Sequence, residues 1–485
     1  MAASLVIGQP NFSSEYSGTG PANLSSPFAG AFDAQGNLWV VDANNNRIFE
    51  FRPPFHDGMN ASLVIGQTSL HGFGSNTTQS GLSGPLAVAF DAAGDLWVSD
   101  SGDNRVLEFV PPFSTGMNAH LILGQSGFLA SGAGTGATNL TSPIGLAFGA
   151  AGELFVSDSG NNRVLGYDPP FAIGMAATIV LGQKGFATTS ASTTATGLYR
   201  PTDVAVGSNG SLWVADSNNN RTLGYAPPFS DGMAASEVLG PYNYTLTNQT
   251  TPYELTYPWG LSFDANGDLW VADSGSDRVL EYLAPVSTTT RPSVVIGEPS
   301  LTDTSPGNVS NTNLSNPVQT FFDPAGDLWV VDSETERVLE FAPAAYLVNV
   351  SELGLPNGTA WSATFDGQVG SAVAPGSISF SVWNGTHPFS VGAVAGYSSS
   401  PTSGSLTVTG AARAFTVAFA ATASSSSGPS TGQLELAIYL LVAVVLVLVV
   451  ALAFEIRRHR AGRAPPAASS WEPPAVQSPP PPKSP

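Results

Sequence analysis

Cysteine is absent from the 485 residues, which excludes disulfide frameworks, thiol nucleophiles and cysteine-ligated metal sites. Charge is also sparse, at 11% of residues against roughly 25% in ordinary soluble domains. Basic residues are the scarcer kind, with 16 Lys and Arg against 36 Asp and Glu and a net charge of −20. Because phosphate binding needs clustered basic residues, a nucleic-acid partner is not expected. Hydrophobic residues reach 42%, which is enough to build a large core.

A repeat of an aspartate and an arginine organises the first 345 residues. The spacing Asp-x4-Arg recurs at intervals of 57 to 59 residues. The pairs are Asp42 and Arg47, Asp100 and Arg105, Asp158 and Arg163, Asp216 and Arg221, Asp273 and Arg278, and Asp332 and Arg337. Around each pair, four short apolar runs are separated by Gly, Pro, Asn and Asp, which predicts four strands per repeat.

Six four-stranded units arranged in a circle would form an all-β, six-bladed β-propeller over residues 1–345, with few exposed strand edges. Only five outer strands of the type LVIGQ follow an inner strand, and the sixth copy stands at the N-terminus. We therefore expect residues 3–9 to complete the last blade, and we expect the propeller to be monomeric.

The repeat resembles a known family. Its pattern P-x-G-[LV]-[AS]-F-D-x-x-G-[DNE]-L-[WF]-V-x-D-S-x-x-N-R is similar to the NHL family of propeller repeats. The connection PPFxxGM resembles that of exported prokaryotic members, and the fifth and sixth repeats lack it. The resemblance implies a six-bladed propeller over roughly residues 1–345.

The Asp-x4-Arg pairs are interpreted as structural. An active site occurs once in a chain, whereas these pairs occur in every repeat. Each aspartate is expected to accept turn N–H groups and to pair with its arginine, which would hold a tight hairpin. The aromatic residue that recurs once in every repeat, as in Trp39 and Trp97, is expected to pack between blades.

Ligand binding is expected where the repeats differ. Residues 242–259 hold five aromatic residues, namely Tyr242, Tyr244, Tyr253, Tyr257 and Trp259. Exposed Tyr and Trp rings suit stacking on sugars or anchoring a protein, so the segment predicts recognition of an extracellular protein or glycan. The alternative is a loop that folds its rings onto its own propeller.

An enzymatic function is the second hypothesis. The resemblance includes metal-dependent lyases and lactonases, which build their sites from His, Asp, Glu and Asn around the central channel. The five histidines, His56, His71, His120, His387 and His459, show no clustering. We therefore expect a binding protein, with no catalytic residue, no metal ligand and no cofactor; an oxygen-only Ca²⁺ site built from acidic hairpins stays open.

Residues 346–420 predict a separate Ig-like β module. The motifs E-x-GLPxGTxW, NGTxxF and GYxxxPxSG resemble small modules of archaeal surface proteins. Alternating strands with Gly, Pro and Asn turns favour a β-sandwich that acts as a spacer.

The C-terminal region predicts a membrane anchor. A Ser/Gly-rich linker over 421–433 precedes a transmembrane helix over 434–456, in which Leu436 to Phe454 carry no charge and would span roughly 28 Å as a helix. Arg457 and Arg458 open a Pro-rich tail over 457–485, and basic flanks stay in the cytoplasm. The expected location is the cell membrane, single-pass, with the N-terminal region extracellular and the tail cytoplasmic.

Sequons support an extracellular location. N-x-Ser/Thr motifs are frequent, and the candidates for glycosylation include Asn76, Asn139, Asn248, Asn308, Asn357 and Asn384. The first twelve residues do not have the basic and apolar regions of an export signal, so we expect that signal to lie outside this sequence.

Overall fold

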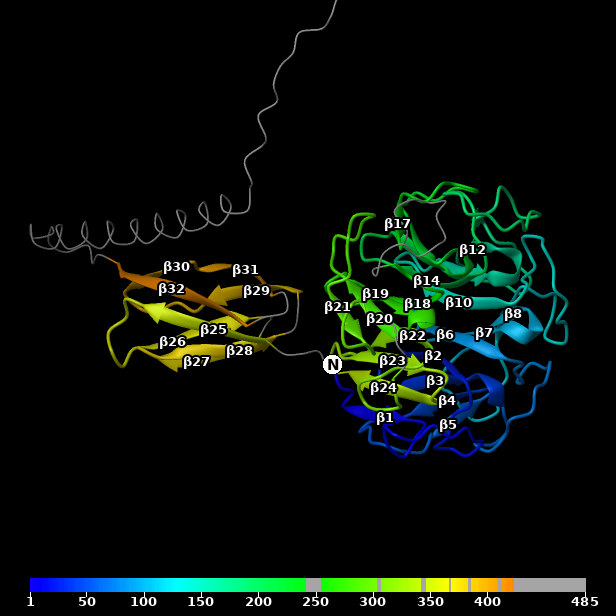
Figure 1. The fold of residues 1–485 in the computed structure, drawn as a ribbon, viewed down its shortest axis with the longest axis horizontal. Coiled ribbons are helices and arrows are strands. Elements are labelled where there is room, and N and C mark those ends of the chain that lie inside the picture. The colour runs from blue at the N-terminus through cyan, green and yellow to red at the C-terminus, as the bar shows by residue number, and fades with distance from the viewer. Residues whose placement is uncertain are drawn as a thin grey trace, which may run out of the picture. The chain divides into compact units, whose positions relative to one another are not determined.

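The computed structural model describes residues 1–240, 254–302, 307–341, 346–365, 368–382, 385–408 and 412–422. Apart from five short 3-10 turns, the regular elements of these residues are strands, which confirms the all-β prediction (Figure 1). Eight four-stranded sheets form, six of them in the repeat region and two in the following β unit.

The repeat region consists of six antiparallel blades. Blade 1 contains β2 (Pro27–Phe32), β3 (Leu38–Asp42), β4 (Arg47–Phe51) and β5 (Leu63–Ile65). Blade 2 contains β6 (Pro85–Phe90), β7 (Leu96–Asp100), β8 (Arg105–Phe109) and β9 (Leu121–Leu123). Blade 3 contains β10 (Pro143–Phe148), β11 (Leu154–Asp158), β12 (Arg163–Tyr167) and β13 (Ile179–Leu181).

The remaining blades follow the same order. Blade 4 contains β14 (Pro201–Val206), β15 (Leu212–Asp216), β16 (Arg221–Tyr225) and β17 (Glu237–Leu239). Blade 5 contains β18 (Pro258–Phe263), β19 (Leu269–Asp273), β20 (Arg278–Tyr282) and β21 (Val294–Ile296). Blade 6 contains β22 (Pro317–Phe322), β23 (Leu328–Asp332), β24 (Arg337–Phe341) and β1 (Leu5–Ile7).

The blades form a closed ring. Each inner strand contacts the inner strand of the next blade, and β22 of blade 6 contacts β2 of blade 1. The N-terminal strand β1 pairs antiparallel with β24, with Leu5 opposite Glu340 and Ile7 opposite Val338 (Figure 1). The first and last described segments of the repeat region therefore share one sheet, and the outer edge of β24 is paired.

The ring has two ends, defined by the turns. In every blade the second and third strands are joined by the Asp-x4-Arg hairpin, and we call this end the upper face. The turn between the first and second strands lies at the opposite end, the lower face, where the third strand also ends.

Aromatic rings fill the space between blades, as the sequence predicts. Trp39 of blade 1 lies 4.8 Å from Phe113 and 5.9 Å from Phe90 of blade 2, measured between ring centroids. Trp97 contacts the equivalent residues of blade 3, Phe148 and Phe171. These edge-to-face contacts between buried tryptophans and half-buried phenylalanines join neighbouring blades.

The second β unit contains two sheets. One has the order β28-β25-β32-β30 and the other β27-β26-β29-β31. The strands are β25 (Tyr346–Leu353), β26 (Ala360–Phe365), β27 (Gln368–Val373), β28 (Ser377–Val382), β29 (Gly385–Val391), β30 (Tyr397–Ser400), β31 (Ser403–Val408) and β32 (Arg413–Ala421). The rings of Phe365 and Phe380, one from each sheet, stack 5.4 Å apart in its core.

The predicted linker, membrane helix and tail, which begin at residue 421, lie almost entirely outside the described residues. Within the described part of the chain, no helix has the length and apolar character needed to cross a membrane.

Ring closure can be tested by shortening a side chain of β1. Ile7 is fully buried, whereas Leu5 of the same strand is half-buried. Replacing a buried Ile by Ala removes apolar contacts and leaves a cavity, so we expect Ile7→Ala to lower the free energy of unfolding by about 2–4 kcal/mol. Chemical denaturation measures the change, and Leu5→Ala is the control with a smaller expected loss. An equal loss for the two variants would contradict the closure role of the buried face of β1.

Candidate functional sites on the two faces of the ring

The Asp-x4-Arg pairs are buried inside the upper hairpins. In each blade the arginine Nε donates to the aspartate Oδ2 over 2.6–2.8 Å, and both side chains are at most 1% exposed. In blade 2, Arg105 also donates to the carbonyl oxygens of Thr78, Gly81 and Phe128, and Asp100 accepts the N–H of Ser83. Because these groups bind the adjoining loops, the geometry supports a structural role for them.

Three aromatic rings meet at the upper end of the central channel. Trp259 follows Pro258, which pairs with Asp273, and this places Trp259 at the hairpin end of β18. Its ring lies 5.4 Å from Phe28 of blade 1 in an edge-to-face arrangement and 5.5 Å from Tyr257. Blades 1 and 5 are not neighbours in the ring, so Phe28 and Trp259 meet across the channel. All three rings are half-buried, and we call them the channel aromatics.

The structure places only part of the predicted aromatic segment. Tyr257 and Trp259 lie together, while Tyr242, Tyr244 and Tyr253 lie outside the described residues. Phe28 was missed in the sequence. The sequence did contain a signal, because Phe28 follows Pro27 as Trp259 follows Pro258. The other four inner strands have no aromatic residue at this second position.

A buried carboxylate with no cationic partner among the described residues lies on inner strand β14. Asp203 is 5% exposed and accepts hydrogen bonds from its neighbour Val204 N and from Leu261 N of blade 5, both over 2.9 Å. Gly145 of blade 3 leaves room for it, since a Cβ there would lie 2.3 Å from Asp203 Oδ1. Burial raises the pKa of Asp203 to about 7, although the two N–H donors act in the opposite direction.

The raised pKa of Asp203 makes stability depend on pH. Between about pH 4 and pH 7 the folded state keeps a proton that the unfolded state has released, so this group destabilises the fold as pH rises through that window. From pH 5 to pH 8 we expect wild type to lose about 2–3 kcal/mol of unfolding free energy relative to Asp203→Asn. Chemical denaturation at several pH values measures this difference. The exposed Asp168→Asn should parallel wild type, and a parallel profile for Asp203→Asn would refute the assignment.

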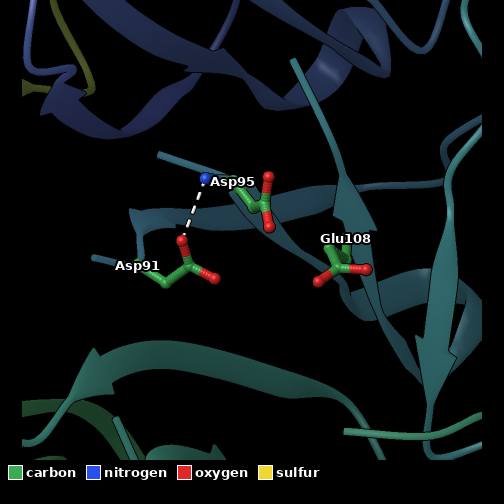
Figure 2. A group of neighbouring side chains, drawn as sticks. All are labelled: Asp91, Asp95 and Glu108. Carbon is green, nitrogen blue, oxygen red and sulfur yellow. Dashed lines mark hydrogen bonds between the residues drawn. The ribbon is translucent and has the colours of Figure 1, made fainter. Parts of the chain in front are cut away.

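Groups of three carboxylates lie at the lower face. Figure 2 shows the group of blade 2, formed by Asp91 and Asp95 of the turn before β7 and by Glu108 of β8. Blades 5 and 6 have equivalent groups, and in each group one oxygen per residue lies within 4.8 Å of the others. We call these groups the acidic triads: Asp91, Asp95 and Glu108; Asp264, Asp268 and Glu281; Asp323, Asp327 and Glu340.

The first aspartate of each triad also has a structural task. Asp91 Oδ1 accepts the N–H groups of Ala93 and Asp95, and its Oδ2 accepts the indole N–H of Trp97 over 3.1 Å. One oxygen of the second aspartate lies within 4.8 Å of one oxygen of the glutamate. The sequence signal was the spacing D-x3-D-x12-E, which blades 2, 5 and 6 share and which the prediction overlooked.

The three carboxylates of each triad lie close enough for their negative charges to repel one another. Burial raises the pKa of Asp95, with further contributions from the charges of Asp91 and Glu108. In the other blades, burial together with neighbouring carboxylates raises the pKa of Asp268 to about 6, that of Asp327 to about 6 and that of Glu281 to about 7. Oxygen-only groups of this kind are the ligands that hard cations such as Ca²⁺ prefer.

The histidines of the described residues do not form a metal cluster. His120 Nδ1 lies 2.6 Å from Glu108 Oε2 of the blade 2 triad, and His387 is buried in the second β unit. His56 and His71 are exposed. No group of three or more candidate metal ligands found in the described part of the chain includes a histidine.

A cavity replaces the triad in blade 4. At the positions of the three carboxylates, this blade has Gly207, Ser211 and Gly224. These residues, with Trp213 and Phe263, line a hollow of about 470 Å³ between blades 4 and 5 at the lower face.

The glycosylation candidates fall mainly on exposed positions. Asn76, Asn308 and Asn357 are exposed and Asn139 is half-buried, whereas Asn248 and Asn384 lie outside the described residues.

Comparisons with known proteins support the fold. Three segments, residues 140–167, 198–221 and 255–282, match the model of the NHL repeat. No curated protein sequence matches this chain. Taken with the six four-stranded sheets, the NHL repeats support an NHL-type β-propeller.

Solved structures show similarity at low identity. A gluconolactonase from Xanthomonas campestris is 14% identical, with 71% of this chain and 99% of that chain covered and a TM-score of 0.43. A protein of unknown function from Bacteroides thetaiotaomicron is 13% identical, with 70% and 75% covered and a TM-score of 0.46. Virginiamycin B lyase from Staphylococcus aureus is 11% identical, with 75% and 91% covered and a TM-score of 0.34. At these values the similarities carry no activity over to this chain.

Proposed function

We propose that this chain is a cell-surface propeller that recognises an extracellular protein or glycan through the upper end of its channel. The observation that carries the proposal is the contact of the channel aromatics, Phe28, Tyr257 and Trp259, with all three rings half-buried. Tyr and Trp offer a broad apolar surface with a polar tip, which suits stacking on a sugar or anchoring a protein side chain.

The position of these rings favours recognition over a purely structural role. Residues that serve the fold recur in every blade, as the buried Asp-x4-Arg pairs do. The second position of the inner strand varies instead, with Phe28, Leu86, Ile144, Thr202, Trp259 and Val318 in chain order. Only blades 1 and 5 carry an aromatic residue there, and their rings come together across the channel.

The charge distribution argues against a polyanionic partner. The repeat arginines are buried and paired with aspartates, so they are not offered to a ligand. A nucleic acid, which requires clustered accessible basic groups, does not fit this surface. We expect the propeller to act as a monomer, because its blades close on themselves and no strand of the ring is supplied by a second chain.

The enzymatic alternative has no specific observation in its favour. The acidic triads lie at the lower face, at the end of the ring opposite the channel aromatics. A lyase or lactonase site of the expected kind would bring His, Asp, Glu or Asn together around the channel. Among the described inner strands, Asp203 is the one residue with a carboxylate.

Recognition can be tested at the channel aromatics. We expect Trp259→Ala and Tyr257→Ala to weaken binding at least tenfold, because each removes a ring from the contact surface. Glycan and surface-protein arrays probed with the purified chain identify the ligand class, and titration of the best hit measures the loss.

The control for this experiment is Ile173→Ala, a 52% exposed side chain in the connection at the lower face. It should bind as wild type does. If both aromatic variants stay folded and bind every hit with unchanged affinity, the proposed surface is wrong.

We further propose that the chain is anchored in the cell membrane with its propeller outside. The support is sequence alone: the uncharged segment from Leu436 to Phe454, the basic residues that follow and the exposed sequon asparagines. The same proposal includes three further points: the chain is glycosylated, it is an archaeal surface protein, and residues 346–420 act as a spacer.

Membrane attachment can be tested by truncation. A chain ending at residue 433 should be released into the soluble fraction, whereas the full chain should sediment with membranes and require detergent. A chain ending at residue 460, which keeps the apolar segment and the first basic residues, is the matched control and should stay with membranes. Recovery of the full chain without detergent would contradict the anchor.

A further inference from the structure

The acidic triad of blade 5 differs from the other triads in ways that suit an ion. We propose that Asp264, Asp268 and Glu281 bind one hard divalent cation, for which Ca²⁺ is the best fit, at the lower face of blade 5. The site goes beyond the proposed recognition function and lies at the other end of the ring.

The spacing of the three carboxylates fits a single ion. One oxygen from each residue lies within 4.8 Å of the other two. Ca²⁺ binds oxygen at 2.3–2.6 Å, so oxygens on opposite sides of one ion lie up to about 5 Å apart. One ion can therefore contact all three carboxylates, and water can complete the six to eight ligands that Ca²⁺ takes.

A buried oxygen in this triad has no partner. Asp268 is 3% exposed, and its Oδ1 accepts the N–H of Ala284 over 2.6 Å. Its Oδ2 has no hydrogen-bond partner among the described residues. An unsatisfied buried carboxylate oxygen is costly, and a cation between Asp264 and Glu281 would satisfy it.

The other two ligands are already oriented. Asp264 Oδ1 accepts the N–H groups of Asn266 and Asp268, both over 2.9 Å. Glu281 accepts a hydrogen bond from the Ser293 hydroxyl. None of the ion pairs between described residues involves Asp264, Asp268 or Glu281, so a divalent cation would supply the compensating charge.

One substitution in the repeat explains why blade 5 stands apart. Blades 1 to 4 have two consecutive prolines after the third strand, at 53–54, 111–112, 169–170 and 227–228. Blade 5 has Ala284 in place of the first proline, and alanine has the backbone N–H that proline lacks. That N–H holds Asp268, whereas blade 2 has Pro111 at the equivalent position and its Asp95 is half-buried.

The other triads are less suited to an ion. In blade 2, Glu108 already pairs with His120 over 2.6 Å. In blade 6, Glu340 accepts the Ser4 hydroxyl as Glu281 accepts that of Ser293, but Asp327 is half-buried where Asp268 is buried. We therefore expect one tight site per chain and not three.

The test is a calorimetric titration of CaCl₂ into the purified full chain after treatment with a chelator. We expect one site with a Kd of about 10⁻⁴ M or tighter, in the range of extracellular calcium modules or better. Asp268→Asn and Glu281→Gln should each weaken binding at least 100-fold. The matched control Asp95→Asn in blade 2 should leave it unchanged.

A second variant and a second readout keep the proposal testable if those substitutions impair folding. Ala284→Pro keeps all three carboxylates but removes the N–H donor, and it should weaken binding about tenfold. Tb³⁺ bound in blade 5 should show luminescence sensitised by Trp270, which lies opposite Glu281 in the ladder and which Trp270→Phe would remove. Excess Ca²⁺ should displace the Tb³⁺.

Three outcomes would overturn the site. The first is the absence of a heat signal and of a shift in the unfolding midpoint of wild type at 10 mM Ca²⁺, roughly 100 times the expected Kd. The second is unchanged binding in Asp268→Asn or Glu281→Gln. The third is an equal loss in Asp95→Asn, which would indicate general screening of acidic residues and no defined site.

Discussion

The pairing of β1 with β24 is the constraint on which the ring depends. Without it, blade 6 would end in an unpaired edge, and the buried side chains of Val6 and Ile7 would leave the core. With it, residues more than 300 positions apart share one sheet, and each inner strand has two inner-strand neighbours. The central channel, its aromatic rings and the turns of the lower face keep their relative positions because the ring is closed.

Much of the scarce basic charge has a structural use at the upper face. Six arginines are buried in the upper hairpins, where each pairs with an aspartate and donates to the carbonyl oxygens of the adjoining loops. A buried ion pair of this kind can stabilise the fold only if its hydrogen bonds are satisfied, and here they are. Chemistry is left to the positions that vary between blades: the inner-strand residues at the channel and the turns at the lower face.

The sequence predicted the parts of the fold that repeat. Six copies of one pattern in phase predicted six four-stranded sheets, and a surplus outer strand at residues 3–9 predicted its place beside β24. The candidate site was predicted only in part, because its contacts cross between repeats. Trp259 was found by aromatic density along the chain, whereas Phe28 lies more than 200 residues away and meets it only once the ring is closed. The proximity of Asp95 and Glu108 can be inferred only when the pairing of Leu96 with Phe109 is known.

Blade 5 shows how a repeat protein can gain a site through the loss of a repeated residue. The strands of this blade keep the register of the other blades, so the fold does not depend on the connection that follows β20. Where blades 1 to 4 have the second proline followed by phenylalanine, blade 5 has Pro285 followed by Val286, and the edge-to-face contact that Phe113 makes with Trp39 has no counterpart against Trp213. A second change in the same connection, Ala284 in place of the first proline, introduces the N–H that orients Asp268 toward two other carboxylates. An ion bound there would link the β18–β19 turn to β20, and Asp268 would join both to the altered connection through the N–H of Ala284.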